Sequence, residues 1–419
     1  MNRPLLVFQA PVATRSGYGD HSRDILKSIF ELDKYDVKIV PTRWGNTPQD
    51  QINPSTDFGN KILQNIATKV DRQPDIFIQI SVANEFKRVG KYNIGITAGV
   101  ETTIAPQEFI QGSNNMDLII TPSEFTKDVL IKTSYDQIDK NTKQKVGELR
   151  LQKPVEVLFE GVDTSFFKSV KSDFLKDVDT DFNFLYVGHW LAGELGHDRK
   201  DTGMMIKTFC TVFKNLPKGK QPGLILKTSS AGFSVMERER IHLNIKSITK
   251  EFGDTCPPIH LVWGDLSETE LNELYNDDKV KAMISFTKGE GYGRPLAEFA
   301  TTGKPIIVSN WSGHKDFLPE KHTVYLEGEL QNVHPTASNQ FLLKESKWFY
   351  VDYTKAAQKI FDVYKNYNTY LKQSEGLKEN ILKNFTLTKM TEKLNNIFNN
   401  FIKEEPKHIE MKLPTIEKL

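Results

Sequence analysis

Short apolar runs alternate with amphipathic stretches along most of the chain. In the first half we expect buried strands in five such runs, at residues 5–9, 37–40, 76–80, 92–97 and 118–121. Residues 22–30 and 60–69 carry apolar positions at helical spacing instead, and Ser123 is a good N-cap for a further helix. This order of strands and helices predicts a parallel sheet covered by helices on both faces.

The alternation continues in the second half. We expect strands at residues 182–187, 223–226, 259–262, 282–286 and 305–309. Helices are expected at residues 202–213, 267–275, 344–367 and 387–401, where the second begins with a capping box of Ser267 and Glu270. Residues 177–181 spell Asp-Val-Asp-Thr-Asp, but these acids precede a strand rather than end one, so an acidic linker is expected there instead of a metal site.

Composition narrows the class of protein. The chain has 419 residues, enough for two domains with real cores, and a net charge of +1 that provides no overall attraction to nucleic acid or membranes. The cysteines, Cys210 and Cys256, suit a reducing compartment. The apolar run at residues 5–8 is too brief for a membrane span. We therefore expect a cytoplasmic protein without integral membrane contact.

The most informative stretch is Gly289-Glu-Gly-Tyr-Gly-Arg-Pro-Leu-Ala-Glu298, which follows an apolar run. We expect a glycine-rich turn there, with Pro295 at the first position of a helix. The amides at the start of that helix favour a phosphate or a sugar hydroxyl. Glu290 and Glu298 are expected to face the same cleft, because an ionised carboxylate accepts hydrogen bonds from hydroxyls.

This stretch, with Gly-Lys-Pro-Ile-Ile-Val-Ser after it, resembles the signature of retaining glycosyltransferase family four, the group 1 glycosyltransferases. The resemblance implies the GT-B fold, an α/β architecture of two Rossmann-like, doubly wound parallel-sheet domains that face each other across a cleft. Viral and phage-type members are one option within the family. The resemblance implies that Glu298 holds the ribose of a nucleotide sugar and that Glu290 is catalytic, holding the donor sugar and stabilising positive charge on its ring. The loop between them, Gly291, Tyr292, Gly293, Arg294, Pro295 and Leu296, joins Glu290 and Glu298 in binding the donor; Arg294 stands where relatives carry an apolar residue.

Further donor-site residues follow from the same resemblance. Gly17 and Gly19 are placed in a glycine loop near the diphosphate, and Trp263 and Gly264 at the nucleobase pocket. Arg199 and Lys200 are expected to be catalytic by neutralising the leaving diphosphate, and Lys227 ends a strand that points into the same cleft. Relatives often have arginine where this chain has His189, which leaves open whether His189 or Arg199 contacts the diphosphate.

The resemblance also divides the chain. It implies an acceptor-side domain over residues 1–170, a nucleotide-sugar domain over 171–384, a helix at about 385–404 that crosses back onto the first domain, and a tail over 405–419. The expected reaction is metal-independent transfer from a UDP-linked sugar with retained anomeric configuration and no other cofactor. For the acceptor side we propose Asp20, His21, Glu101 and Thr102, because each follows a strand or loop expected to face the cleft.

Several alternatives stay open. The acceptor can be a glycan, lipid, protein or metabolite, or a hydroxymethylated base in DNA. For DNA, the lysine-rich residues 132–153 are the one hint of a basic surface, although a solvated loop or helix is the more ordinary interpretation. The same fold also serves nucleotide-sugar epimerases, and a non-catalytic nucleotide-sugar-binding protein is a third class.

Overall fold

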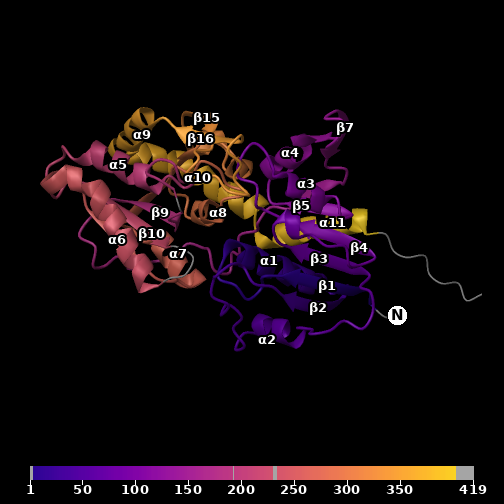
Figure 1. The fold of residues 1–419 in the computed structure, drawn as a ribbon. Coiled ribbons are helices and arrows are strands. Elements are labelled where there is room, and N and C mark those ends of the chain that lie inside the picture. The colour runs from indigo at the N-terminus through magenta and orange to yellow at the C-terminus, as the bar shows by residue number, and fades with distance from the viewer. Residues whose placement is uncertain (1–2, 192, 230–233, 403–419) are drawn as a thin grey trace, which may run out of the picture.

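The computed structural model describes residues 3–402 except residue 192 and residues 230–233, and contains two helix-covered sheets (Figure 1). The first sheet has six parallel strands in the order β2-β1-β3-β4-β5-β8. Its strands are β1 Leu5–Ala10, β2 Asp36–Pro41, β3 Ile76–Ile80, β4 Tyr92–Ile96, β5 Leu118–Thr121 and β8 Val155–Val157. Its helices are α1 Gly17–Leu32, α2 Asp57–Gln64, α3 Gln107–Ser113 and α4 Glu124–Lys132.

The second sheet repeats this plan with the strand order β11-β10-β9-β12-β13-β14, again all parallel. Its strands are β9 Asn183–His189, β10 Gly223–Ser229, β11 Ile259–Val262, β12 Val280–Ser285, β13 Ile306–Ser309 and β14 Val324–Leu326. Its helices are α5 Thr202–Phe213, α6 Val235–Thr249, α7 Glu268–Asn276, α8 Arg294–Ala300, α9 Tyr353–Lys365 and α10 Tyr367–Asn384. The predicted α/β fold of two Rossmann-like domains is thus confirmed.

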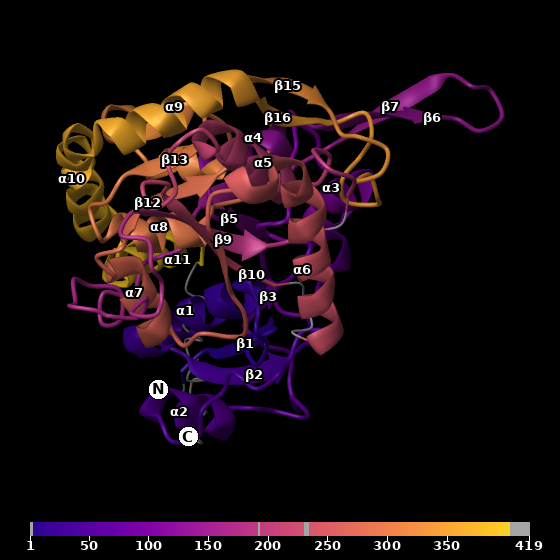
Figure 2. The same cartoon turned by 90° about the vertical axis from the view of Figure 1, so that its left-hand side faces the viewer.

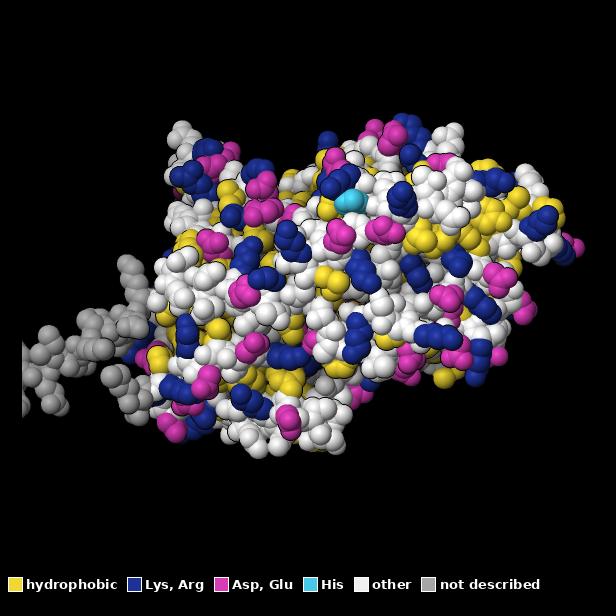
Figure 3. All heavy atoms as spheres, turned by 180° about the vertical axis from the view of Figure 1, so that it is seen from behind, with side chains coloured by type: hydrophobic (Ala, Val, Ile, Leu, Met, Phe, Trp, Pro, Cys, Tyr) yellow, Lys and Arg dark blue, Asp and Glu magenta, His cyan; other side chains and the backbone are white. Residues whose placement is uncertain are grey.

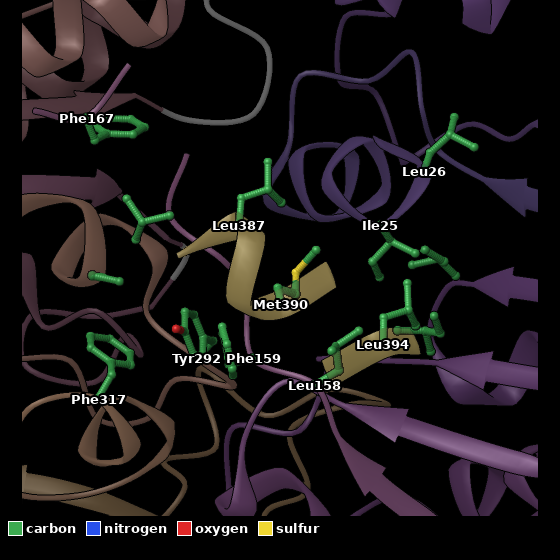
Figure 4. Packing of buried hydrophobic residues seen from close by; sticks show 14 of the residues in the cluster. Ile25, Leu26, Leu158, Phe159, Phe167, Tyr292, Phe317, Leu387, Met390 and Leu394 are labelled. Carbon is green, nitrogen blue, oxygen red and sulfur yellow. The ribbon is translucent and has the colours of Figure 1, made fainter. Parts of the chain in front are cut away.

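The last described helix returns to the first sheet. This helix, α11 Leu387–Phe401, packs against α1, and its side chains Leu387, Met390 and Leu394 join the same apolar cluster as Ile25 and Leu26 (Figure 4). Thr386 caps α11 by accepting from the Lys389 amide, and the apolar residues then recur at helical spacing on one face.

Two segments of the chain connect the domains, and they are hydrogen-bonded to each other. The Val162 amide donates to the Phe385 carbonyl, and the Leu387 amide donates to the Val162 carbonyl, both at 2.9 Å. A Cβ on Gly161 would lie 2.6 Å from the Leu387 Cα, so only glycine permits this approach. The outgoing and returning segments therefore form one paired connection.

Residues 132–153 do not form the solvated loop or helix that was expected from the sequence. These residues form an antiparallel hairpin, β6 Ser134–Ile138 and β7 Lys145–Arg150, which projects from the first domain (Figure 2). Asp139 accepts from the Asn141 and Thr142 amides to make the turn, while Tyr135 and Leu149 pair across the strands and pack against the core at its base. Because most of the neighbouring residues are polar or charged, the sequence pattern did not reveal this apolar pair.

Among the other elements, one differs from the prediction in type and two helices differ by several residues in their bounds. Residues 347–351 form β16 Lys347–Val351, paired with β15 Gly328–Asn332, because its aromatic side chains Trp348 and Phe349 are buried against a core. Helix α1 begins at Gly17 rather than residue 22, since Ser16 accepts from the Gly19 amide as its N-cap. Helix α2 ends at Gln64, several residues before the expected 69. The expected tail, 405–419, lies outside the described residues.

Candidate active site

The glycine-rich stretch lies where the two domains meet. Strand β12 ends at Ser285, and the chain then runs through the glycine-rich turn into α8, whose N-cap is Gly293 in a left-handed conformation with φ 104°. Helix α8 begins at Arg294, so Pro295 is its second residue instead of its first. A Cβ on Gly291 would lie 2.2 Å from the Ala98 carbonyl oxygen in the first domain. The absence of a side chain at Gly291 therefore allows the backbones of the two domains to approach each other.

Glu290 is held by two cations. Lys200 Nζ lies 2.5 Å from Glu290 Oε1, Arg199 Nη1 lies 3.2 Å from Oε2, and Thr287 Oγ1 donates to Oε1 at 2.6 Å. Burial alone raises the pKa of Glu290, but Lys200 and Arg199 outweigh it and bring the pKa down to about 2. The Glu290 carboxylate is thus ionised throughout the physiological range, and the structure brings together the three residues predicted to be catalytic.

Arg199 also reaches into the first domain. Its Nε lies 2.9 Å from Glu101 Oε2, and its Nη1 donates to the Gly289 carbonyl at 2.7 Å. Burial raises the pKa of Glu101, and the Arg199 charge opposes that rise. Glu101, predicted on the acceptor side, therefore shares its arginine with the predicted donor-site residue Glu290.

A second charged group surrounds Glu298. Arg294 Nε donates to Glu298 Oε1 at 2.8 Å, and Arg294 Nη1 pairs with Asp24 on α1 of the first domain. Tyr275 donates its hydroxyl to Glu298 Oε2 at 3.3 Å. Burial raises the pKa of Glu298 to about 7 even though Arg294 opposes the shift. Arg294 thus connects the two domains at the carboxylate expected to hold the ribose.

Glu160, between β8 and the connection, belongs to the same group. Its side chain is buried, and within the described part of the chain it has neither a hydrogen bond nor an ion pair. Burial raises its pKa to about 8, and the nearby carboxylates of Asp24 and Glu298 add to the rise while Arg294 opposes it. Sequence reasoning missed Glu160 and Asp24. Asp24 could have been found from the sequence, because it lies beside Ile25 and one turn from Ser28 on the side of α1 that is buried.

The space between these groups is small. A cavity of about 20 Å³ is lined by several predicted site residues, namely Lys200, Glu290, Gly293, Pro295 and Leu296. Ligand sites for molecules of nucleotide size enclose roughly 300–1,000 Å³, so such a ligand requires the domains or side chains to separate. A larger hollow of about 440 Å³, beside Phe30 and Lys61, is lined by none of the predicted site residues.

The predicted nucleobase residues Trp263 and Gly264 directly follow β11, whereas Lys227 lies inside β10, two residues before its end at Ser229, and not at a strand end as predicted. Lys227 Nζ donates to the Gly264 carbonyl at 2.7 Å, so this lysine is directed toward Gly264, and Trp263 is half-buried. His189 lies with Nδ1 3.4 Å from the Ser229 carbonyl, and its pKa is lowered by burial and then by the Lys200 charge. Of the two candidates for the diphosphate, Arg199 is the one that contacts Glu290.

The first-domain candidates do not gather at one point. His21 is buried with both ring nitrogens lacking a hydrogen-bond partner among the described residues, and burial followed by the Arg294 charge lowers its pKa to about 3. Asp20 pairs with Arg23 on its own helix, and Thr102 donates to the Ile104 carbonyl.

The two glycines of α1 differ in what they do. Gly17 is exposed with open space around it, whereas a Cβ on Gly19 would lie 2.2 Å from the Thr14 carbonyl oxygen. Gly19 is therefore required by its own turn. Tyr18, between them, stacks on Trp44 at 3.9 Å and accepts from the Ala98 amide, an aromatic pair at the cleft that the sequence did not reveal.

The sequence matches no protein-family model and no curated protein. Solved structures do resemble the fold. A sucrose-phosphate synthase from Thermosynechococcus elongatus superposes with a TM-score of 0.62 at 13% identity, over 95% of this chain and 99% of that one. A glycosyltransferase from Rickettsia africae gives 0.59 at 14% identity, over 97% and 100%. Anabaena HepE, in complex with UDP-glucose, gives 0.60 at 11% identity, over 95% and 100%. The chain has the GT-B fold.

Proposed function

We propose that this protein is a glycosyltransferase that moves a sugar from a nucleoside diphosphate to an acceptor hydroxyl. The observation that carries the proposal is that Glu290, in the loop before α8, forms ion pairs with Arg199 and Lys200, in the loop before α5, where the two Rossmann-like domains meet. Open α/β sheets bind ligands at the carboxyl ends of their strands, where this cluster lies. The resembling structures support the donor class, since one is a UDP-glucose complex and another is a sucrose-phosphate synthase.

In the proposed reaction, the bond between the anomeric carbon and the diphosphate oxygen breaks as the acceptor oxygen bonds to that carbon on the same face. The acceptor proton passes to an oxygen of the leaving diphosphate. Arg199 and Lys200 neutralise the charge that develops there, the electrostatic contribution that is usually largest. Both cations now pair with Glu290 and Glu101, so a bound diphosphate competes with these carboxylates for Arg199 and Lys200.

Finer assignments belong to the proposal as well. We propose the family-four, retaining and metal-independent chemistry, a UDP-linked donor, and a ribose contact at Glu298. The acceptor is left as a hydroxyl-bearing molecule, including the hydroxymethylated base of DNA. Seen from behind, the molecule carries Lys and Arg interspersed with Asp and Glu, so this face offers no continuous basic surface to a duplex (Figure 3). Among the described residues, every helix is too short or too polar to span a bilayer.

The first test is ligand-induced thermal stabilisation by a panel of nucleoside diphosphates and their sugars. A ligand that binds only the folded state raises the melting temperature by mass action. We expect one nucleotide to give a selective rise that is lost in Glu298→Gln and kept in Glu156→Gln, a half-exposed glutamate of β8. No rise with any nucleotide contradicts the proposal.

Turnover then separates the enzyme classes. Product that appears with an acceptor, and falls in Lys200→Met, supports transfer. Conversion of the donor without any acceptor indicates an epimerase-like enzyme instead. Binding without conversion, across a broad set of acceptors, indicates a non-catalytic binder.

A further inference from the structure

Two histidines and a glutamate meet where the loop that precedes α5 lies against the connection between β15 and β16. His197 and His334 stack face to face with ring centroids 3.7 Å apart and planes inclined by 13°. Glu194 completes the group, and one ligand atom from each of the three residues lies within 4.8 Å of the others. Residues 194 and 334 are distant in sequence, so the fold assembles this cluster.

Local structure sets up each member. The His197 amide donates to the Glu194 carbonyl at 2.8 Å, a turn that places the side chains three residues apart on one side. Gly196 occupies a left-handed conformation with φ 81°, which this tight turn requires. His334 lies in the connection between β15 and β16, with Nδ1 2.8 Å from Thr336 Oγ1, so that its Nε2 remains for another partner.

An independent observation points to a ligand. His197 Nδ1 is buried, and among the described residues it has no hydrogen-bond partner. Leaving a buried polar nitrogen unpaired costs about 1–3 kcal/mol, so such an atom in a native fold calls for an explanation such as an ion. The stacking of the two imidazole rings does not supply the missing contact, because ring lone pairs lie in the ring plane.

We propose that Glu194, His197 and His334 bind a divalent metal ion of the Zn²⁺ class. Two imidazoles and a carboxylate are a known zinc ligand set, with water in the fourth position of a tetrahedron. Tetrahedral bonds of about 2.1 Å set neighbouring ligand atoms roughly 3.4 Å apart, so the side chains must close by about an ångström and turn out of the stack. His334 Nδ1 lies 2.8 Å from Thr336 Oγ1 and accepts from the Thr336 amide at 3.3 Å; when Nε2 binds a metal, Nδ1 carries the proton and donates it to Thr336 Oγ1 instead.

The surrounding charge permits a cation. The Lys288 charge acts on His197, but its ammonium pairs with Asp201 at 3.0 Å and donates to the Asp198 carbonyl. Glu194 adds a negative charge at the site itself. Oxygen-preferring ions such as Mg²⁺ gain little from two imidazoles, so the ligand set selects the borderline metals.

The metal would fix the loop that carries Arg199 and Lys200. His197 precedes Arg199 by two residues, and the Lys288 amide donates to the Arg199 carbonyl at 2.7 Å. The Lys288 carbonyl in turn accepts from the Phe349 amide of β16. An ion shared with His334 adds a second link between this loop and the β15–β16 hairpin. This inference does not depend on the proposed function.

The test uses the full-length protein, first stripped with a chelator and then titrated with Zn²⁺ in competition with a chromophoric chelator. We expect one Zn²⁺ per chain, and at least tenfold weaker binding in His197→Ala, in His334→Ala and in Glu194→Gln. His242→Ala, on helix α6 outside the cluster, is the matched control and is expected to bind like the wild type. Mg²⁺ is expected not to compete.

Two further measurements make the outcome decisive. Co²⁺ is expected to give the visible absorption of a four-coordinate ion with nitrogen ligands in the wild type and not in His334→Ala. Equal Zn²⁺ affinity in the wild type and the three cluster variants overturns the proposal, as does equal loss in His242→Ala. Should His197→Ala not fold, Glu194→Gln and His334→Asn decide, because both positions lie on surface loops.

Discussion

Glu160 allows the sharpest test of the electrostatics at the domain junction. Burial raises its pKa from 4.5 to about 8, so the folded protein holds a proton there that the unfolded chain has already released. Stability therefore falls as pH rises from about 4.5 and levels off above about pH 8. Glu160→Gln is nearly isosteric and cannot ionise, so it removes this pH-dependent cost.

The magnitude follows from the shift. At about 1.4 kcal/mol per pH unit, a rise from 4.5 to about 8 costs the folded state up to about 5 kcal/mol at alkaline pH. For a domain of this size, each kcal/mol moves the melting temperature by roughly 2–4 °C. We expect Glu160→Gln to melt on the order of 10 °C above the wild type at about pH 8.5, and close to it at about pH 5.

The assay is thermal unfolding of both proteins across that pH range, followed by fluorescence, with Glu156→Gln as the control for the substitution itself. The quantity that matters is the difference in melting temperature as a function of pH. A constant difference refutes the reasoning, because it means that the Glu160 carboxyl is solvated in the fold. A variant that is less stable than the wild type at alkaline pH also refutes it, since the carboxylate would then have a favourable partner.

Two further predictions concern contacts that hold the second domain and the domain junction. Lys288→Met leaves the Asp201 carboxylate buried without its counter-charge, and we expect a loss of about 3–5 kcal/mol in the free energy of unfolding. Adding Asp201→Asn is expected to restore part of that loss in urea denaturation; a neutral single variant argues against the pair. Gly291→Ala places a Cβ 2.2 Å from the Ala98 oxygen, so the domains are expected to separate and the radius of gyration in X-ray scattering to increase. Gly17→Ala, with open space around it, is the control, and an unchanged radius for Gly291→Ala would show that the junction yields in another way.

The sequence was sufficient for the repeated architecture. Strands β3 and β5 and helices α5 and α11 have the predicted bounds, because each is a mainly apolar run or a stretch with apolar residues at helical spacing. The hairpin β6–β7 was missed because its strands are mostly exposed and only one cross-strand pair packs on the core. Where most side chains of a strand are exposed, the order of apolar and polar residues does not identify the strand.

The candidate site was likewise predictable from the sequence only in part. The family resemblance pointed to Glu290, Arg199 and Lys200, and the structure places Glu290 in contact with both cations. The link from Arg294 to Asp24 could not be predicted, because it depends on how two domains far apart in sequence face each other. Whether these residues bind a donor remains the prediction stated above.

The packing of α11 on α1 has a consequence for the order in which the protein is made. The first sheet leaves the ribosome early, but the helix that covers part of its apolar surface is the last one described in the chain. Domains generally fold as units during synthesis, starting with the one nearest the N-terminus. Here every segment of the second domain is synthesised while the first domain still waits for α11. The nascent chain therefore exposes the apolar faces of Ile25 and Leu26 until α11 has been synthesised and can pack against them.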